Sequence, residues 1–314
     1  MNDSETLLNI LLSPSIKRQR FASMAEWFKS FNQQTRQFDL PLDRALLGGR
    51  FSSNVSFAFA AAYQSAIEAL FQPEQIALAA FCVSEKNGNH PRAIESCLIQ
   101  QANQTVISGR KSFVSGAADA QLLYVACQDK RSGDGFDATG RSLIKVVKLD
   151  AGQAGVEIQN LPALGFVPDI AHGSVTLREV QLSAEMILPG DGYLDYVKSF
   201  RSYEDVHVLA AIAAYRLGEA IEGKWPKQII ETHISLILAL RALVGMNLQQ
   251  AAAHIALAAI RTQLEDLLSR SEAHFQTSNP QAYSDWQRDK RLLNIARQAH
   301  QTRTASAWQR IIPS

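Results

Sequence analysis

Two short polar segments at the ends of apolar runs could do chemistry in this chain. FCVSE occupies residues 81–85 and GRKSFVSGA occupies residues 109–117. In each, β-branched and aromatic residues lead into Ser, Lys or Gly, which predicts a strand followed by a turn. A strand end with hydroxyl side chains and backbone amides can bind the polar edge of a planar cofactor, and Phe113 adds a ring face. An ordinary hairpin is the simpler interpretation.

A second candidate is the acidic pair Glu204 and Asp205, at the predicted start of a helix whose cap is Ser202. A carboxylate in a pocket can act as a general base when desolvation raises its pKa toward the working pH. Acidic residues in the first turn of a helix are also common partners of the helix dipole, and that interpretation stays open. His207 follows closely and is interpreted as a half-buried helix residue.

The elements that must position these residues fall into three parts. Apolar residues at three- and four-residue spacing predict helices in the first and last parts, with a turn at Gly48–Gly49, and alternation predicts about seven short strands between them. We therefore expect an α+β multi-domain chain. Its parts are an N-terminal helical domain, a central antiparallel β-barrel or sandwich and a C-terminal helical bundle, over residues 1–75, 76–190 and 195–314.

Composition narrows the classes of function. The 314 residues include 31 basic and 30 acidic side chains without a long run of one sign, which argues against nucleic acid and anionic membranes as partners. The N-terminal apolar stretch is too short for a membrane span, so we expect a cytoplasmic protein. Cys82, Cys97 and Cys127 lack paired spacing, so neither a disulfide framework nor a metal site is expected.

Three segments in order resemble the middle domain of the acyl-CoA dehydrogenase superfamily. They are FCVSE at 81–85, GRKSFVSGAADAQLLYVACQ at 109–128 and LGFVPDIAHGSVTLREVQLSAEMIL at 164–188. In the family, the first segment has an aromatic residue or Leu, then Cys or Ala, then Val, then Thr or Ser, and then Glu. The second is a Gly-x-Lys-x-aromatic segment, and the third is a Leu-Gly stretch before a strand. The order helices, strands, helices is also that of the family. The chain resembles a short, divergent member with a shortened N-terminal helical domain.

The resemblance implies an FAD-dependent acyl-CoA dehydrogenase-like oxidoreductase of fatty acid metabolism. In the family a base removes the α-proton of an acyl thioester while the β-hydrogen leaves as hydride to flavin N5. One form of the family places its Glu where this chain has Glu204 and Asp205. The other form places it where this chain has Arg297, which cannot act as a base. The residues that match flavin-contacting positions are Phe81, Val83, Ser84, Gly88, Asn89, Phe113, Val114 and Ser115.

The resemblance also implies partners and leaves an alternative. Acyl-CoA would be the substrate, a homodimer or homotetramer the assembly, and an electron acceptor protein a further partner. The family's Arg-x-x-Phe-Gly segment, which reaches a neighbour's FAD phosphates, is replaced by GKWPKQ at 223–228. The replaced segment and the arginine at position 297 both favour the alternative, which is a non-catalytic binding or partner subunit that has lost the base, with or without the loss of FAD. A flavin monooxygenase on the same fold is an intermediate case.

Overall fold

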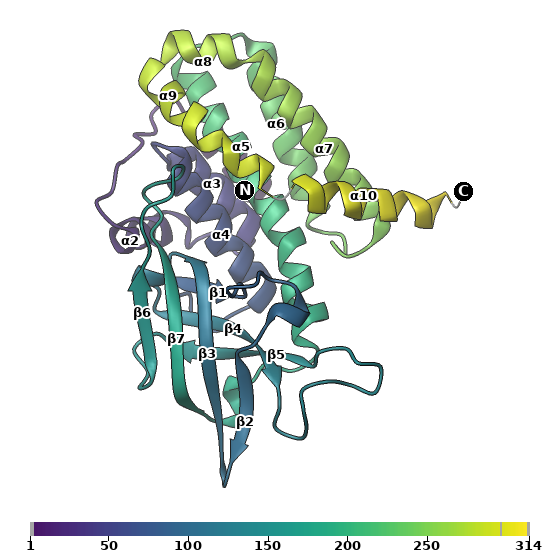
Figure 1. Ribbon diagram of the computed structural model, residues 1–314. Helices are drawn as coiled ribbons and strands as arrows, with labels where there is room; N and C mark the ends of the chain where they lie inside the picture. Colours follow the sequence, from purple (N-terminus) through teal and green to yellow (C-terminus); the bar gives the residue numbers. More distant parts are fainter. Residues whose placement is uncertain (1–2, 296, 313–314) are drawn as a thin grey trace. The chain divides into compact units, whose positions relative to one another are not determined.

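The computed structural model describes residues 3–295 and 297–312. The chain divides into two compact units (Figure 1). A helical unit combines both ends of the chain, residues 1–69 and 202–314, with the short segment 165–169. A sheet unit holds residues 70–164 and 170–201. The predicted division at 1–75, 76–190 and 195–314 stays a prediction.

The helices follow the apolar spacing of the sequence, with polar caps at several starts. Ser23 Oγ, for example, accepts the N–H of Glu26 at 3.1 Å and begins the second helix, which buries Trp27 and Phe31. The helices are α1 (Asp3–Leu12), α2 (Met24–Thr35), α3 (Pro41–Phe51), α4 (Val55–Phe71), α5 (Lys198–Glu222), α6 (Lys227–Leu243), α7 (Ala251–Arg270), α8 (Glu272–Ser278), α9 (Pro280–Asp289) and α10 (Arg297–Ile311).

The predicted turn at Gly48–Gly49 is wrong, because both glycines lie inside α3. A Cβ atom at Gly48 would stand 2.3 Å from the Cβ of Ala61, and one at Gly49 would stand 2.2 Å from the carbonyl oxygen of Ala211. Neither distance is sterically allowed. The two glycines therefore let α3 pack closely against α4 and α5, at the cost of poorer helix propensity.

The last predicted helix is interrupted. The pattern from residue 284 to residue 311 predicts one helix, but α9 ends at Asp289, a 3-10 turn covers Lys290–Asn294, and α10 begins at Arg297. The buried carboxylate of Asp289 accepts the backbone N–H of Val167 at 2.8 Å. Because a buried carboxylate must be paired, this long-range contact fixes the end of α9, and helix periodicity alone does not show it.

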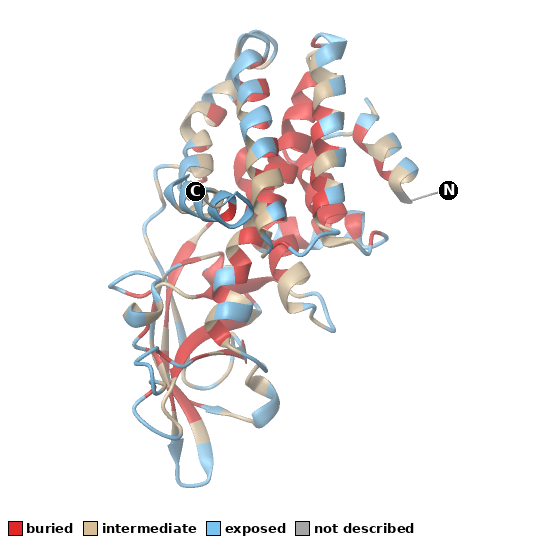
Figure 2. Ribbon diagram, turned by 90° about the vertical axis from the view of Figure 1, so that its right-hand side faces the viewer, coloured by how far each residue is buried: buried red, intermediate tan, exposed pale blue. Residues whose placement is uncertain are grey.

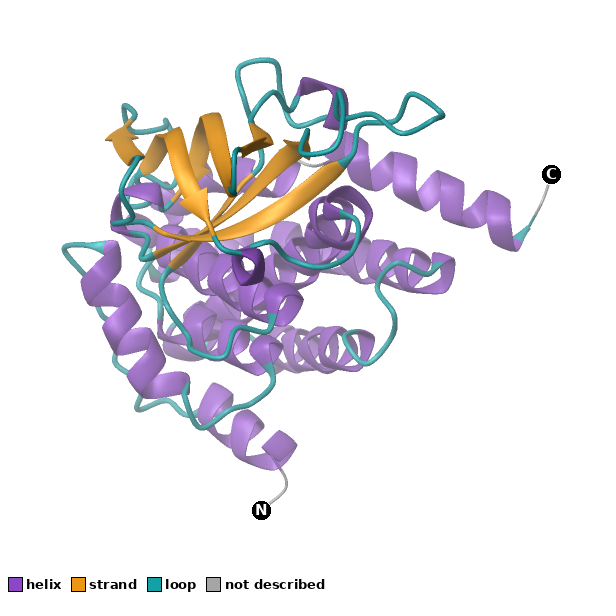
Figure 3. Cartoon of the chain, turned by 90° about the horizontal axis from the view of Figure 1, so that it is seen from below, coloured by secondary structure: helices purple, strands orange, loops and turns teal. Residues whose placement is uncertain are grey.

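The sheet unit contains one seven-stranded mixed sheet with the order β1-β4-β2-β3-β7-β6, and β5 pairs with the other edge of β4. Its strands are orange in Figure 3. Four pairings are antiparallel, as predicted: β2/β3, β3/β7, β6/β7 and β4/β5. The predicted all-antiparallel arrangement is wrong for β4, which pairs in parallel with both β1 and β2. The strands are β1 (Ala79–Cys82), β2 (Cys97–Gln101), β3 (Gln104–Ser115), β4 (Leu122–Asp129), β5 (Ile144–Asp150), β6 (Val156–Asn160) and β7 (His172–Leu182).

The core of the sheet unit comes from the inward positions of these strands. Leu98, Ile107, Leu123, Val147 and Val175 are completely shielded from solvent. Each such side chain contributes about 1.5–3 kcal/mol by burial. Cys82 and Cys127 belong to the same cluster, and burial raises the pKa of each thiol to about 12, so both stay protonated core residues. Figure 2 shows the buried residues gathered along the inner faces of the strands and helices.

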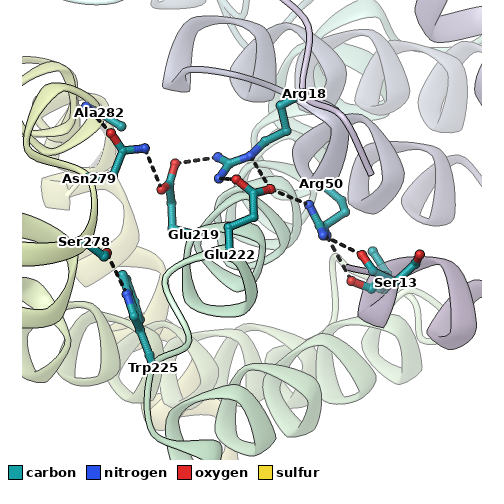
Figure 4. A network of polar contacts seen from close by, with 10 residues as sticks. Ser13, Arg18, Arg50, Glu219, Glu222, Trp225, Ser278, Asn279 and Ala282 are labelled. Atoms are coloured by element: carbon teal, nitrogen blue, oxygen red, sulfur yellow. Dashed lines mark hydrogen bonds and ion pairs between the residues drawn. The ribbon is translucent and has the colours of Figure 1, made fainter. Parts of the chain in front are cut away.

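A charge network ties the N-terminal segment of the helical unit to the end of α5 (Figure 4). Arg18, between α1 and α2, donates to Glu219 and, over 2.6 Å, to Glu222. Arg50 of α3 donates to the backbone oxygen of Ser13 at 2.8 Å. Asn279, which caps α9, donates its amide to Glu219 at 3.1 Å. Residues far apart in the sequence thus share one charge network, in which Glu219 and Arg50 are buried and Glu222 is exposed.

Candidate functional site

The two polar segments singled out from the sequence lie side by side in the sheet unit. The backbone N–H of Ser112 donates to the carbonyl oxygen of Ser84 over 2.9 Å. Lys111 Nζ donates to the carbonyl oxygen of Val83 over 3.3 Å. The end of β1 and the far end of β3 therefore form one continuous edge, which we call the serine edge: residues 83–84 and 112–115.

A β-bulge sets the direction of Phe113 on this edge. The pairing of β3 with β7 shifts between Lys111 and Val114, so Ser112 and Phe113 have no pairing partner on β7. Phe113 takes a φ of 55°, in the left-handed region that non-glycine residues avoid at a cost of about 1–3 kcal/mol. Its side chain is 65% exposed. Bulges commonly re-aim a side chain next to a site, and here the result is an aromatic ring presented outward.

Ser115, at the end of the serine edge, hydrogen bonds to a histidine that the sequence did not single out. His172 Nδ1 lies 3.0 Å from the carbonyl oxygen of Ile170, which can only accept, so Nδ1 carries the proton. Burial lowers the pKa of His172 and keeps it neutral. Its Nε2 therefore accepts, and the Ser115 hydroxyl donates to it over 3.2 Å. The lone pairs of the Ser115 oxygen remain available to a ligand donor.

A buried ion pair supports the edge. Lys111 Nζ lies 2.6 Å from Glu85 Oε1, and both side chains are almost fully shielded. The Glu85 carboxylate also accepts the backbone N–H groups of Glu95 and Ser96 at 2.9 and 3.0 Å. Burial acts to raise the pKa of Glu85, but Lys111 and the two N–H groups outweigh it and lower the pKa. The ionised carboxylate thus joins β3 to the loop that enters β2.

The other predicted cofactor positions differ in what they can offer. Phe81 packs edge-on against Phe71 and Phe200 with ring centroids 5.1 Å away in each case, and Val114 is buried, so only their backbones can reach a ligand. Gly88 and Asn89 are exposed on a tight turn, where Gly88 has a φ of 106° and exchanges backbone hydrogen bonds with Glu85. Val83 and Ser84 are half-buried.

The acidic pair lies deeper in its helix than the sequence predicts. Helix α5 begins at Lys198, not after a Ser202 cap, so Glu204 and Asp205 occupy its second turn. Pairing with the helix dipole falls off beyond the first turn and therefore explains these two residues poorly. The side chain of Glu204 is half-buried, whereas Asp205 is buried.

Asp205 lies in a cluster that the sequence did not reveal. Its Oδ1 is 3.0 Å from His300 Nε2, and its Oδ2 accepts from Arg303. His300 also lies 2.7 Å from the guanidinium of Arg261 on α7. The signal that was available is the three-residue spacing of His300 and Arg303, which puts them on one face of α10. Their partner on α5 could not be read from that spacing.

The remaining candidates have simpler roles. His207 is buried, its Nδ1 donates to the carbonyl oxygen of Tyr203 over 2.7 Å, and burial lowers its pKa to about 4. It is a neutral helix residue. Arg297, which the sequence resemblance matched to the base of one form of the family, begins α10 with a 58% exposed side chain.

The described residues were found to hold neither a metal-binding group nor a helix suited to crossing a membrane. In residues 3–295 and 297–312, no group of three or more His, Cys, Asp or Glu side chains is placed to bind a metal ion. Within the same ranges, none of the helices has the length and apolar character that crossing a membrane requires.

Comparisons with known proteins identify the fold. No protein-family model and no curated protein matches this chain. Solved structures do match: a probable acyl-CoA dehydrogenase from Mycobacterium abscessus has a TM-score of 0.62 at 13% identity, covering 98% of this chain and 98% of that one. Butyryl-CoA dehydrogenase from Megasphaera elsdenii has a TM-score of 0.60 at 13% identity, covering 96% and 88%. FMN-bound TdsC from Paenibacillus sp. A11-2 has a TM-score of 0.62 at 14% identity, covering 87% and 83%.

Proposed function

We propose, from the acyl-CoA dehydrogenase-like fold of this chain, that it is a flavin-dependent oxidoreductase acting on an acyl thioester such as acyl-CoA. The observation that carries the proposal is the serine edge, where the exposed Phe113 follows Ser112, the residue bonded to Ser84, and precedes Ser115 by two positions. Similar structures include an FAD-dependent dehydrogenase, at 12% identity and a TM-score of 0.62, and the FMN-bound TdsC. We propose FAD as the cofactor.

The serine edge fits the flavin ring system in its chemistry. A planar heteroaromatic ligand needs an aromatic or apolar face beside it and hydrogen-bonding groups along its polar edge. Phe113 offers the face. The Ser115 hydroxyl donates its hydrogen bond to His172, so its oxygen offers an acceptor. Ser84 offers a second hydroxyl on the adjoining strand end. When bound there, the flavin would supply the acceptor for a hydride.

We place the base that removes the α-proton at Glu204, with Asp205 as a positioning residue. Both oxygens of Asp205 are engaged, one with His300 and one with Arg303. That arrangement suits a residue that holds α10 against α5. Glu204 precedes it by one residue and so points about 100° away around the helix axis. Glu204 therefore lies on a different side of α5 from the Asp205 oxygens that hold α10, and it is the carboxylate that we propose as the base.

The purified protein tests this proposal directly. We expect a yellow preparation with flavin absorbance that bleaches when an acyl-CoA is added without oxygen, because electrons pass from the thioester to the flavin. A yellow preparation that does not bleach, but consumes oxygen with reduced flavin, would support a monooxygenase instead. A colourless preparation that stays free of flavin after FAD is supplied would contradict both.

The second candidate is a non-catalytic relative that binds an acyl thioester or a partner protein. Two observations favour it: Arg297 stands where one form of the family has its base, and GKWPKQ at 223–228 replaces the segment that reaches a neighbour's FAD phosphates. A colourless protein that still binds acyl-CoA would establish this candidate. For either function we propose a cytoplasmic homodimer or homotetramer, which light scattering of the purified protein would measure.

A further inference from the structure

A cavity of about 450 Å³ lies within the helical unit between α7 and α10, which cross in Figure 1. Cavities of this volume are large enough for a small organic ligand. Part of the wall is apolar, with Leu257, Ala305 and the ring of Trp308. The titratable side chains that line it are His254, Arg261, Glu265, Arg297, His300 and Arg303.

Hydrogen-bond donors exceed acceptors around His300. Its Nε2 lies 2.7 Å from the guanidinium of Arg261 and 3.0 Å from Asp205, and its Nδ1 lies 3.0 Å from the guanidinium of Arg303. A neutral imidazole has only one acceptor nitrogen. If Nδ1 accepts from Arg303, then Nε2 carries the proton and donates to Asp205. The guanidinium of Arg261 then faces the Nε2–H group, which is itself a donor. If Nε2 accepts from Arg261, Nδ1–H faces Arg303. In the first tautomer the Arg261 N–H group that faces His300 has no acceptor there. In the second, Arg303 keeps its bond to Asp205, but the Nδ1–H group of His300 faces a donor.

The carboxylates nearby do not make up the difference. Glu265 is shared at long range, 3.8 Å from Arg261 and 4.0 Å from Arg297. Among the described residues, Arg261 Nε is buried without a hydrogen-bond partner. Burial also lowers the pKa of Arg261, an effect that nearby Asp205 and Glu265 do not fully offset. Three arginines thus face two carboxylates, which leaves an excess of positive charge at the cavity.

We infer that this cavity binds the oxyanion group, a carboxylate or a phosphate, of a small organic ligand. Guanidinium groups bind such oxyanions in charge-assisted and often bidentate contacts. The oxyanion supplies an acceptor to Arg261, whose Nε is buried without one, and offsets the excess positive charge of the three arginines. The apolar part of the ligand lies against Leu257 and Trp308. This inference does not depend on the proposed function, because it is argued from the side chains around the cavity and requires neither a flavin nor a base.

Calorimetric titration of the full-length protein with three aromatic probes tests the inference. Phenyl phosphate and benzoate share a ring and differ in the oxyanion, so their relative affinities tell which group the cavity prefers. Benzyl alcohol has the ring without the charge. We expect saturable binding of at least one anion and no detectable binding of the alcohol. Equal binding of all three probes, or binding of none, would overturn the inference.

Variants locate the binding. Arg261→Gln should weaken binding of the preferred anion by about tenfold or more, a loss of about 1.4 kcal/mol. Arg270→Gln is the matched control, because Arg270 lies on the same helix with an exposed side chain 2.9 Å from Asp266, outside the cavity lining. An equal affinity in Arg261→Gln and the wild type would contradict the assignment.

A second pair of variants guards against misfolding. Ala258 lines the cavity, so Ala258→Glu places a tethered carboxylate there, whereas Ala258→Gln adds the same bulk without charge. We expect the Glu variant to abolish binding of the probe anion and to melt at a higher temperature than the Gln variant. The inference would be contradicted if the Glu variant bound the anion with the same affinity as the Gln variant. It would also be contradicted if the Glu variant melted at a lower temperature than the Gln variant.

Discussion

At the scale of single residues, the first prediction concerns Glu204. If it is the base, Glu204→Gln should reduce turnover by about 100-fold or more while flavin content stays unchanged, because only proton abstraction is lost. The measurement is steady-state dehydrogenation of an acyl-CoA together with the flavin-to-protein absorbance ratio. Full activity in the variant would remove Glu204 from the mechanism.

Asp205→Asn should behave differently. Its side chain holds Arg303 and His300 of α10, so the variant should lose stability by about 1–3 kcal/mol, with activity falling through misplacement of the helix. Chemical denaturation measures the loss. Asp266→Asn is the control, since Asp266 is 63% exposed and pairs with Arg270 on the surface. An Asp205→Asn variant that is fully stable but inactive would make Asp205 the base instead.

The sequence could identify the serine edge but not the partners of its residues. Phe113 and Ser115 end a run of β-forming residues, a local signal. The histidine that orients the Ser115 hydroxyl lies 57 positions away, and Arg303 lies 98 positions from Asp205. Nothing in local spacing connects such pairs, because only the sheet register and the helix packing bring them together.

At the scale of elements, the Glu85–Lys111 pair should be essential to the serine edge. Lys111→Met leaves a buried carboxylate without its cation, which costs about 3–5 kcal/mol. The double variant Glu85→Gln, Lys111→Met should be more stable than Lys111→Met alone, because no unpaired charge remains. Urea denaturation of the two variants checks the order. If the double variant is the less stable one, the pair is not the source of the loss.

The buried histidines of α5 and α6 should make the protein sensitive to acid. Burial lowers the pKa of His207 from 6.5 to about 4, and that of His233, with a smaller effect of Arg216, to about 3. Between these values and pH 6.5 the unfolded chain binds protons that the folded chain refuses, so stability falls as pH falls. For His207 alone the loss approaches about 3 kcal/mol at pH 4.

Denaturation at a series of pH values measures this slope. His207→Gln should flatten it between pH 6.5 and pH 4, because the variant has no imidazole to protonate at that position. His90→Gln is the control, since His90 is exposed and lies in the sheet unit, outside α5 and α6. An unchanged slope in His207→Gln would contradict the assignment to this residue.

Element types were predictable, but several boundaries were not. Apolar spacing indicated α6 and α7 correctly. It failed at Gly48–Gly49, where close packing against Ala61 and Ala211 outweighs the usual preference of glycine for turns. It failed again at Asp289, whose contact with Val167 ends α9. In each case tertiary contacts override local propensity.

At the scale of the whole molecule, the order helices, strands, helices predicted the fold class. It did not show that residues 1–69 and 202–314 form one compact unit. Nor did it show the parallel pairings of β4, because β-strand periodicity is the same in parallel and antiparallel sheets. The joining of the two ends depends on contacts such as that between Arg18 and Glu219, which lie 201 positions apart.

That contact gives the last prediction. Glu219 is 2% exposed, and Arg18→Ala would remove the cation that pairs with it, so the helical unit should lose about 3 kcal/mol. The segment between α1 and α2 should also become accessible to proteases, because the ion pairs of Arg18 hold this segment against α5. Arg20→Ala is the matched control, since Arg20 is exposed in the same segment. If the two variants unfold at the same denaturant concentration and are cut at the same rate, the ends of the chain are held together by apolar packing and not by this charge network.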